Sequence, residues 1–211
     1  LTWLKRSGCV FVFVGLETLR AEMLAHIGKP DLLRLGANRY QEQIARIHAH
    51  GMAVFGSFIV GLDGDTADVF EPIRSFCLAA DVDCTLVNVL CPTPDTLLWE
   101  RLERDNRLLY TNFPADYALY TQDNVSFRPQ GMTAAELQDG TRWLIASLTR
   151  LPVTLARARR TWRVTHSPLA TLTALGWNWR TYQGLRNFPS RDVRAVAGTV
   201  KDSAPEFAVI G

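Results

Sequence analysis

The sequence has 211 residues, of which 47% are apolar and 21% charged, and its formal net charge is +2. This composition excludes a disordered chain, which combines low hydrophobicity with high net charge, and the length suits one sizeable core with a small appended domain. No apolar run reaches the roughly 18 residues that a membrane-spanning helix needs. The first residues, LTWLKRSG, have the pattern of a helix end, so we expect a fragment whose true beginning is missing.

The first half of the chain repeats one pattern, a continuous apolar run followed by a helical stretch. The predicted strands are 9–16, 53–62 and 85–90, and the predicted helices are 40–50, 66–80 and 97–109. Apolar runs without polar alternation are typical of parallel strands buried on both faces. Asn38 can cap the first helix, and Asp65 or Thr66 the second. The sequence therefore predicts an α/β fold with a parallel sheet.

The pattern changes after residue 110. Residues 112–130 are rich in turn formers and predict a loop, after which Thr133 and Glu136 form a capping box at the start of a helix. Two more helices are expected beyond Pro152. We expect three parts: an α/β core over 1–110, a small helical and arginine-rich extension over 111–195, and a tail over 196–211.

The charges are unevenly distributed. Residues 1–149 hold 18 acidic and 13 basic residues, whereas residues 150–195 hold nine arginines and one aspartate. The cluster of Arg157, Arg159, Arg160 and Arg163 can contact phosphates, an anionic lipid surface or an acidic substrate. A solvated helix face or a docking surface for the acidic part of the chain is the alternative. No recognised nucleic-acid module accompanies the charge, so nucleic acid is not an expected partner.

The cysteines and histidines give no pattern of a metal site. The cysteines are Cys9, Cys77, Cys84 and Cys91, too few for a disulfide scaffold and without a close CxxC pair. We expect buried, reduced thiols and hence a cytoplasmic compartment. His48 and His50, two residues apart on a helix, are expected to complement the negative end of its dipole. No metal ligands are predicted.

Two of the predicted strands end in the same way, with Gly15-Leu16-Glu17 and Gly61-Leu62-Asp63. Ligands of parallel α/β folds lie at the carboxyl ends of the strands, and glycine allows a ligand to approach the backbone. The alternative is that both glycines shape tight turns and both acids are solvated. The sequence leaves the two interpretations open.

Three segments, in order, resemble the second half of a radical SAM core: SGCVFVFVGLETL, YQEQIARIHAHGMAVFGSFIVGLDGDT with Lys29 before it, and VLCPTPDTLLWERL. They are most similar to the branch that carries an N-terminal cobalamin-binding domain. The resemblance covers residues 1–110, and 111–165 resemble the helical extension found in part of that branch. It implies half of a partial (β/α) barrel, with S-adenosylmethionine and a four-iron, four-sulfur cluster at the strand ends.

The resemblance also implies contacts with the cofactor. Glu17 and Thr18 match the polar end of the fourth barrel strand, and Gly56 to Gly61 match the fifth-strand motif beside the adenine. The expected cofactor-lining residues are Glu17, Thr18, Ser57, Gly61 and Leu90. The segment from Pro92 to Thr96 matches a sixth-strand motif, but Asp95 stands where that motif has glycine, which puts the turn in question.

The CxxxCxxC loop that ligates the cluster in this family is absent. The resemblance therefore implies the C-terminal part of a radical SAM enzyme, with or without cobalamin, that is inactive as this fragment, and no catalytic residue is assigned. Its expected partners are the missing N-terminal part and a small-molecule or lipid substrate, with membrane-surface contact through the arginine-rich segment. The alternative is a complete, small, doubly wound module that binds a ligand or partner without catalysis.

Cutting a barrel in half would leave an unpaired strand. The segment VFVFV, residues 10–14, then becomes an apolar edge strand without charge or proline. Such edges promote association between chains. The fragment is therefore expected to be poorly soluble or to self-associate.

Overall fold

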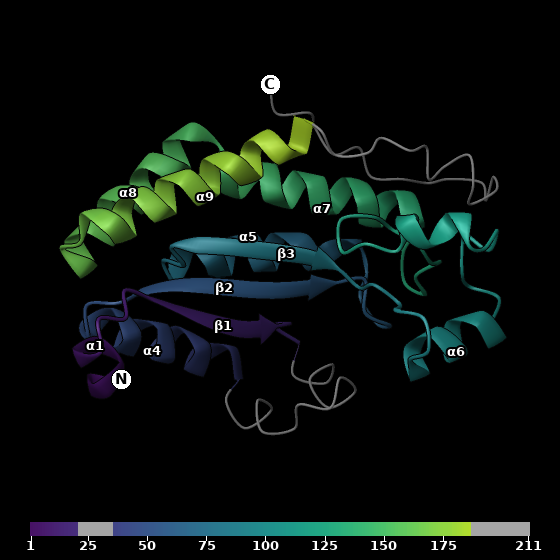
Figure 1. The fold of residues 1–211 in the computed structure, drawn as a ribbon, viewed down its shortest axis with the longest axis horizontal. Helices are drawn as coiled ribbons and strands as arrows, with labels where there is room; N and C mark the ends of the chain where they lie inside the picture. The colour runs from purple at the N-terminus through teal and green to yellow at the C-terminus, as the bar shows by residue number, and fades with distance from the viewer. Residues whose placement is uncertain (21–35, 187–211) are drawn as a thin grey trace. The chain divides into compact units, whose positions relative to one another are not determined.

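The computed structural model describes residues 1–20 and 36–186, which form two compact units (Figure 1). Unit 1 takes the described residues of 1–58, 71–87 and 144–187, and unit 2 takes those of 59–70 and 88–143. The elements are α1 (Thr2–Arg6), β1 (Phe11–Glu17), α4 (Gly36–Ala49), β2 (Ala53–Val60), η1 (Ala67–Val69), α5 (Phe70–Ala79), β3 (Cys84–Val89), α6 (Leu97–Arg104), η2 (Ala115–Leu119), α7 (Ala134–Thr149), α8 (Leu151–Thr165) and α9 (Pro168–Arg186). The predicted tail, 196–211, and Lys29 lie outside the described residues, and the predicted domain boundary after residue 110 stays a prediction.

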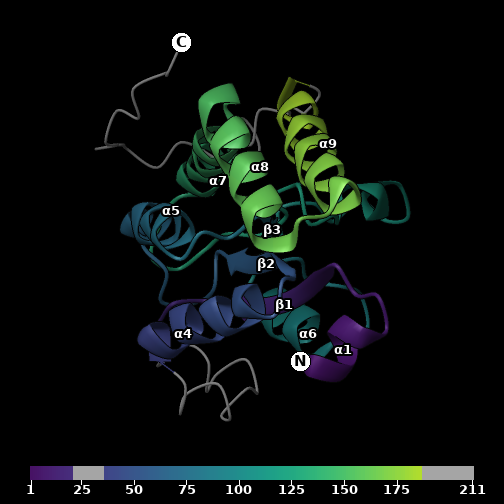
Figure 2. The same cartoon turned by 90° about the vertical axis from the view of Figure 1, so that its left-hand side faces the viewer.

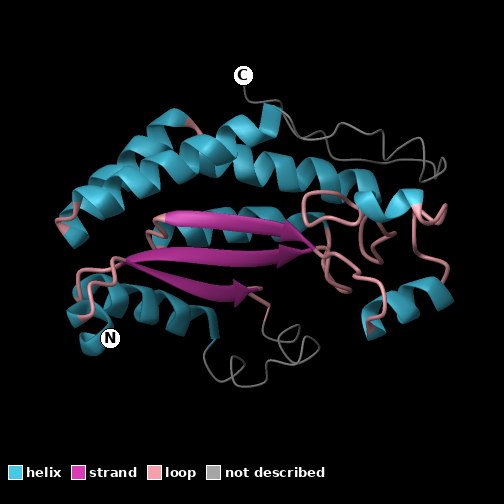
Figure 3. Cartoon of the chain, in the orientation of Figure 1, coloured by secondary structure: helices cyan, strands magenta, loops and turns pink. Residues whose placement is uncertain are grey.

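The described strands form one sheet in the order β1-β2-β3. β1 and β2 are parallel, with Phe11 opposite Ala53 and Gly15 opposite Ser57. The arrows of all three strands point the same way in Figure 3. The predicted α/β fold with parallel strands and a helical C-terminal part is therefore confirmed, and β1 is at one edge of the described sheet.

In unit 1, α4 lies on one side of the strands, and α8 and α9 lie on the other side (Figure 2). Tyr40, Ile44 and Ile47 of α4 are buried, as their spacing of four and three residues predicts. The prediction that Asn38 caps this helix is wrong, because α4 begins at Gly36 and Asn38 lies inside it. A helix can begin before its first buried residue, so the apolar stripe alone misplaces the start.

The α4 helix ends where a glycine can take the left-handed conformation. Gly51 has φ +71°, and its N–H donates to the carbonyl of His48 at 2.8 Å. This closes the last turn before β2.

Helices α8 and α9 confirm the two helices expected beyond Pro152, which lies in the first turn of α8. They run side by side in Figures 1 and 2. No helix among the described residues combines the length and apolarity needed to cross a membrane.

In unit 2, α6 ends at Arg104, before the predicted end at residue 109. Asn106 takes φ 52°, and the chain then forms an antiparallel bridge between Leu108 and Phe127. Apolar residues after the helix therefore belong to an extended segment, which the helical pattern does not reveal.

The capping box at the start of α7 is confirmed. The N–H of Thr133 donates to Glu136 Oε2 at 2.6 Å, and the N–H of Glu136 donates to Thr133 Oγ1 at 3.1 Å. These two backbone N–H groups, which have no partner within the helix, are thus each paired with a side chain.

Candidate cofactor-binding site

The carboxyl end of β1 closes in a tight turn. The ladder with β2 shifts register between Gly15 and Glu17, and Glu17 has φ 62°, a left-handed conformation that is uncommon for glutamate. Thr18 is buried; its N–H donates to the carbonyl of Leu16 at 2.8 Å, and its Oγ1 accepts from the N–H of Arg20 at 3.2 Å. A bulge of this kind at a strand end redirects side chains.

Ser57 of β2 lies next to this turn in unit 1. It pairs with Gly15, and the following residue, Phe58, pairs with Glu17. Ser57 is also buried. The structure therefore brings three of the five predicted residues, Glu17, Thr18 and Ser57, to neighbouring positions on adjacent strands, and their contact with a cofactor stays a prediction.

Tyr40 of α4 adds a buried hydroxyl near the same turn. This hydroxyl has no hydrogen-bond partner among the described residues. Burial raises the pKa of Tyr40, and the negative charge of Glu17 raises it further. The phenol is thus neutral and available as a hydrogen-bond donor. In the sequence, Tyr40 is the first position of the predicted helix 40–50, and no local pattern indicates a polar role for its hydroxyl.

Gly61, in unit 2, is required by the turn after β2. It has φ +88°, and the N–H groups of Gly61 and Leu62 both donate to Asp65 Oδ2 at 3.0 Å. A Cβ at Gly61 would lie 2.6 Å from Cδ2 of Leu137. Asp65, predicted as a helix cap, therefore holds this turn instead, while Thr66 precedes the short helix η1.

The acid that follows this glycine is paired within unit 2. Asp63 Oδ1 accepts from Arg107 Nη2 at 2.7 Å, and its Oδ2 lies 3.0 Å from Arg101 Nη2. At the end of β2 the structure shows the tight turn at Gly61 that one interpretation expects. Asp63, which that interpretation takes as solvated, instead forms ion pairs. A cofactor role for Gly61 stays a prediction.

The N–H of Leu90 donates to the carbonyl of Val60, the residue before Gly61, at 2.9 Å. Leu90 lines a cavity of about 350 Å³ at the carboxyl end of β3, together with Asn88, Cys91, Tyr120 and Gln122. This volume falls at the lower end of the range of small-molecule sites, about 300–1,000 Å³.

The titratable groups of this cavity are neutral. Burial raises the pKa of Tyr120 to about 12, and its hydroxyl donates to the carbonyl of Tyr110 at 2.6 Å. Burial also raises the pKa of the Cys91 thiol. The cavity therefore offers apolar contact and uncharged hydrogen-bonding groups, which suits a neutral ring with polar edges.

Asp95 precedes the first residues of α6 in a left-handed conformation. Its φ is 64°, in the left-handed region that aspartate tolerates better than most residues. The next residue, Thr96, caps α6 by accepting a hydrogen bond from the N–H of Trp99 at 3.3 Å. The match of this turn to the family motif stays a prediction.

The described residues do not fit an iron–sulfur cluster. They contain no group of three or more His, Cys, Asp or Glu side chains placed to hold a metal ion. Burial raises the pKa of Cys77 to about 11 and that of Cys84 to about 12, so both remain thiols rather than the thiolates that bind iron. The described residues therefore offer no set of thiolate ligands for a cluster.

His48 lies in the last turn of α4, where a positive charge complements the helix dipole, but its side chain pairs with an acid outside the helix. Its side chain is buried, and Nε2 donates to Asp83 Oδ2 at 2.9 Å. His50 stays on its own helix, with Nδ1 2.8 Å from the carbonyl oxygen of Arg46. The partner of His48 is 35 residues away, which no local pattern reveals.

No family model matches the chain. Curated proteins similar to it include the bacteriochlorophyllide d C-12(1)-methyltransferase of Chlorobaculum tepidum, which is 29% identical over 101 residues. The hopanoid C-2 methylase of Rhodopseudomonas palustris is 30% identical over 99 residues, and an uncharacterized methyltransferase of Synechocystis is 33% identical over 103 residues.

These matches cover 46–48% of this chain and 18–21% of the relatives. The chain thus spans about a fifth of the length of the curated relatives that it matches. Over about half of its own length, it is similar to proteins named as methyltransferases.

Proposed function

We propose that this chain is the C-terminal part of the core of a radical S-adenosylmethionine methyltransferase. Three motifs in family order, a parallel sheet, and similarity to named methyltransferases support the proposal. The observation that carries it furthest is the position of Ser57, inside β2, next to the end of β1 that bears Glu17 and Thr18. Parallel α/β proteins bind cofactors at this edge of the sheet.

Each of these residues has a distinct role in the proposal. The carboxylate of Glu17 accepts hydrogen bonds from the amino group or ribose hydroxyls of S-adenosylmethionine, and the hydroxyls of Ser57 and Tyr40 add donors. For unit 2, taken by itself, the cofactor contacts that the resemblance implies at Gly61 and Leu90 stay predictions. S-adenosylmethionine is the methyl donor, and we assign its cluster and a cobalamin cofactor to sequence outside these 211 residues.

We further propose a largely apolar substrate. Two relatives are named for bacteriochlorophyllide d and for hopanoids. A lipid or ring-containing small molecule would be consistent with these names. The test is transfer of a labelled methyl group from S-adenosylmethionine into organic-soluble material by the full-length gene product.

The proposal is tested by anaerobic reconstitution with iron and sulfide. The 211-residue chain alone should assemble no stoichiometric cluster and cleave no S-adenosylmethionine, whereas the full-length gene product should do both. A cluster signal in electron paramagnetic resonance of the 211-residue chain would overturn the assignment of the ligands elsewhere. A full-length product that neither cleaves the cofactor nor transfers methyl groups would favour a non-catalytic binding module.

A further inference from the structure

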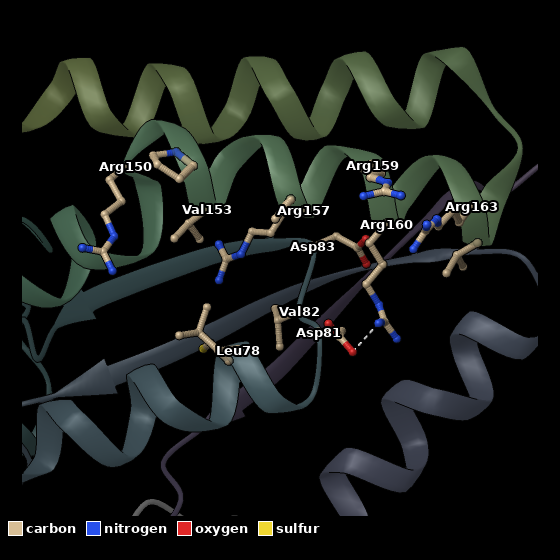
Figure 4. Close-up of a pocket in the computed structure, with 14 residues that line it drawn as sticks. Leu78, Asp81, Val82, Asp83, Arg150, Val153, Arg157, Arg159, Arg160 and Arg163 are labelled. Atoms are coloured by element: carbon tan, nitrogen blue, oxygen red, sulfur yellow. Dashed lines mark ion pairs between the residues drawn. The ribbon is translucent and has the colours of Figure 1, made fainter.

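An open groove of about 860 Å³ lies in unit 1 between α8 and the turn that follows α5 (Figure 4). Five arginines line it: Arg150, Arg157, Arg159, Arg160 and Arg163. Two aspartates, Asp81 and Asp83, lie on the opposite side. The arginine-rich segment that the sequence singled out therefore forms one wall of a concave site rather than a uniformly solvated helix face.

Arg157 is the buried member of this set, with only 6% of its surface exposed. Its Nη1 donates to Asn178 Oδ1 at 3.2 Å, and its Nη2 has no hydrogen-bond partner among the described residues. Figure 4 shows its guanidinium extending from α8 into the groove. A buried cation with an unpaired edge is costly, and an anion in the groove would satisfy it.

Neither aspartate supplies that anion. Asp81 pairs with Arg160 at 2.5 Å. The carboxylate of Asp83 accepts from the Thr161 hydroxyl, the Val54 N–H and His48 Nε2, at 2.6, 2.8 and 2.9 Å. Its oxygens are therefore engaged by groups other than the free edge of Arg157.

The groove carries an excess of positive charge. Its five arginines and two aspartates leave a formal charge of +3. Within the described part of the chain, Arg150, Arg159 and Arg163 make no ion pair. The planar guanidinium group binds phosphate oxygens through two parallel hydrogen bonds, which makes phosphate a well-matched ligand.

We propose that this groove binds a phosphate group, with Arg157 as the buried anchor and Arg160 and Arg163 at the rim. The phosphate can belong to a soluble ester or to a phospholipid headgroup. The inference does not depend on methyl transfer.

The test measures binding by the 211-residue chain at constant ionic strength. Calorimetry and thermal unfolding report binding of inorganic phosphate against chloride, and flotation reports binding to phosphatidylglycerol against phosphatidylcholine vesicles. Arg157→Met keeps the length of the side chain but removes the charge. Arg104→Met, on the exposed surface of α6, removes one charge outside the groove and is the matched control.

Arg157→Met should weaken binding of inorganic phosphate or of phosphatidylglycerol vesicles by roughly tenfold or more, and Arg104→Met by less than about twofold. Binding of free phosphate identifies a soluble ligand, and binding of the vesicles alone identifies a headgroup. Should Arg157→Met fail to fold, the double variant Arg160→Gln/Arg163→Gln must show the loss. Equal effects of Arg157→Met and Arg104→Met, or no binding of either probe, would overturn the proposal.

Discussion

The hydroxyl of Thr161 donates a 2.6 Å hydrogen bond to Oδ1 of Asp83, which lies 78 residues earlier in the chain. The other carboxylate oxygen accepts from the N–H of Val54 and from His48, and the backbone carbonyl of Asp83 accepts from Asn178 at 3.1 Å. One buried residue thus connects α4, β2, α8 and α9 within unit 1. Buried carboxylates persist only where hydrogen bonds replace their hydration.

Replacing Asp83 should destabilise the fold far more than replacing Asp81. Asp83→Asn presents an amide nitrogen that cannot accept, so at least one of its buried donors loses its partner. We expect a loss of about 2–4 kcal/mol in the free energy of unfolding, measured with urea. Asp81→Asn breaks only a partly exposed ion pair with Arg160 and should cost less than about 1 kcal/mol. Similar losses for both variants would contradict this account of Asp83.

Gly61→Ala should destabilise unit 2 even without any ligand. The new Cβ would be 2.6 Å from Leu137 Cδ2, at a residue whose φ is +88°. We expect a loss of about 1–3 kcal/mol in thermal or urea unfolding. Gly176→Ala, in α9 where a Cβ meets nothing within 4 Å, should instead gain up to about 1 kcal/mol. An unchanged stability of Gly61→Ala would show that the turn can relax.

The features that sequence predicted correctly are local ones. The buried stripe of α4, the reciprocal bonds of Thr133 and Glu136, and the end of α4 near Gly51 depend on residues within one or two turns. The local pattern does not predict the early end of α6, because Leu108 pairs with Phe127, a residue outside the helical segment, instead of continuing the helix.

The candidate site was predictable only in outline. Sequence placed Glu17 and Ser57 at strand ends, and the ladder makes them neighbours. Among the described residues, the Tyr40 hydroxyl and Nη2 of Arg157 have no hydrogen-bond partner, and this depends on which groups the fold places around them. Such an environment is a property of packing rather than of spacing along the chain.

A substitution at Phe13 tests whether the exposed edge strand β1 causes self-association. Phe13 lies on β1 with 62% of its surface exposed, and its ring stacks on Phe55 at 5.3 Å. Phe13→Lys places a charge on an apolar edge and should reduce self-association, measured by light scattering. Trp3→Lys, on α1 with 78% exposure, removes an aromatic outside the sheet and should change little. A monomeric wild-type chain at the same concentration would contradict the edge-strand account.

Alkaline pH should destabilise unit 1 through its buried thiols. Burial raises the pKa of Cys77 and Cys84 from 9.0 to about 11 and 12, so the folded chain retains protons that the unfolded chain releases. Stability is therefore constant below about pH 9 and falls as pH rises towards 11–12, by up to about 1.4 kcal/mol per pH unit for each thiol. The comparison is urea unfolding at pH 8 and 10.5. The double variant Cys77→Ala/Cys84→Ala should lose less stability over this interval, and an equal loss would exclude the thiols as its cause.

The most direct test of the proposed function is the affinity of the full-length gene product for S-adenosylmethionine, measured by equilibrium dialysis. Ser57→Ala removes a buried hydroxyl beside Glu17, whereas Ser75→Ala removes an exposed one from α5. Loss of one hydrogen bond to the ligand predicts about five- to tenfold weaker binding for Ser57→Ala, with thermal stability recorded alongside, and no more than about a twofold change for Ser75→Ala. Equal affinities for the wild type and both variants, or no binding by the wild type, would contradict the assignment of the strand ends to this cofactor.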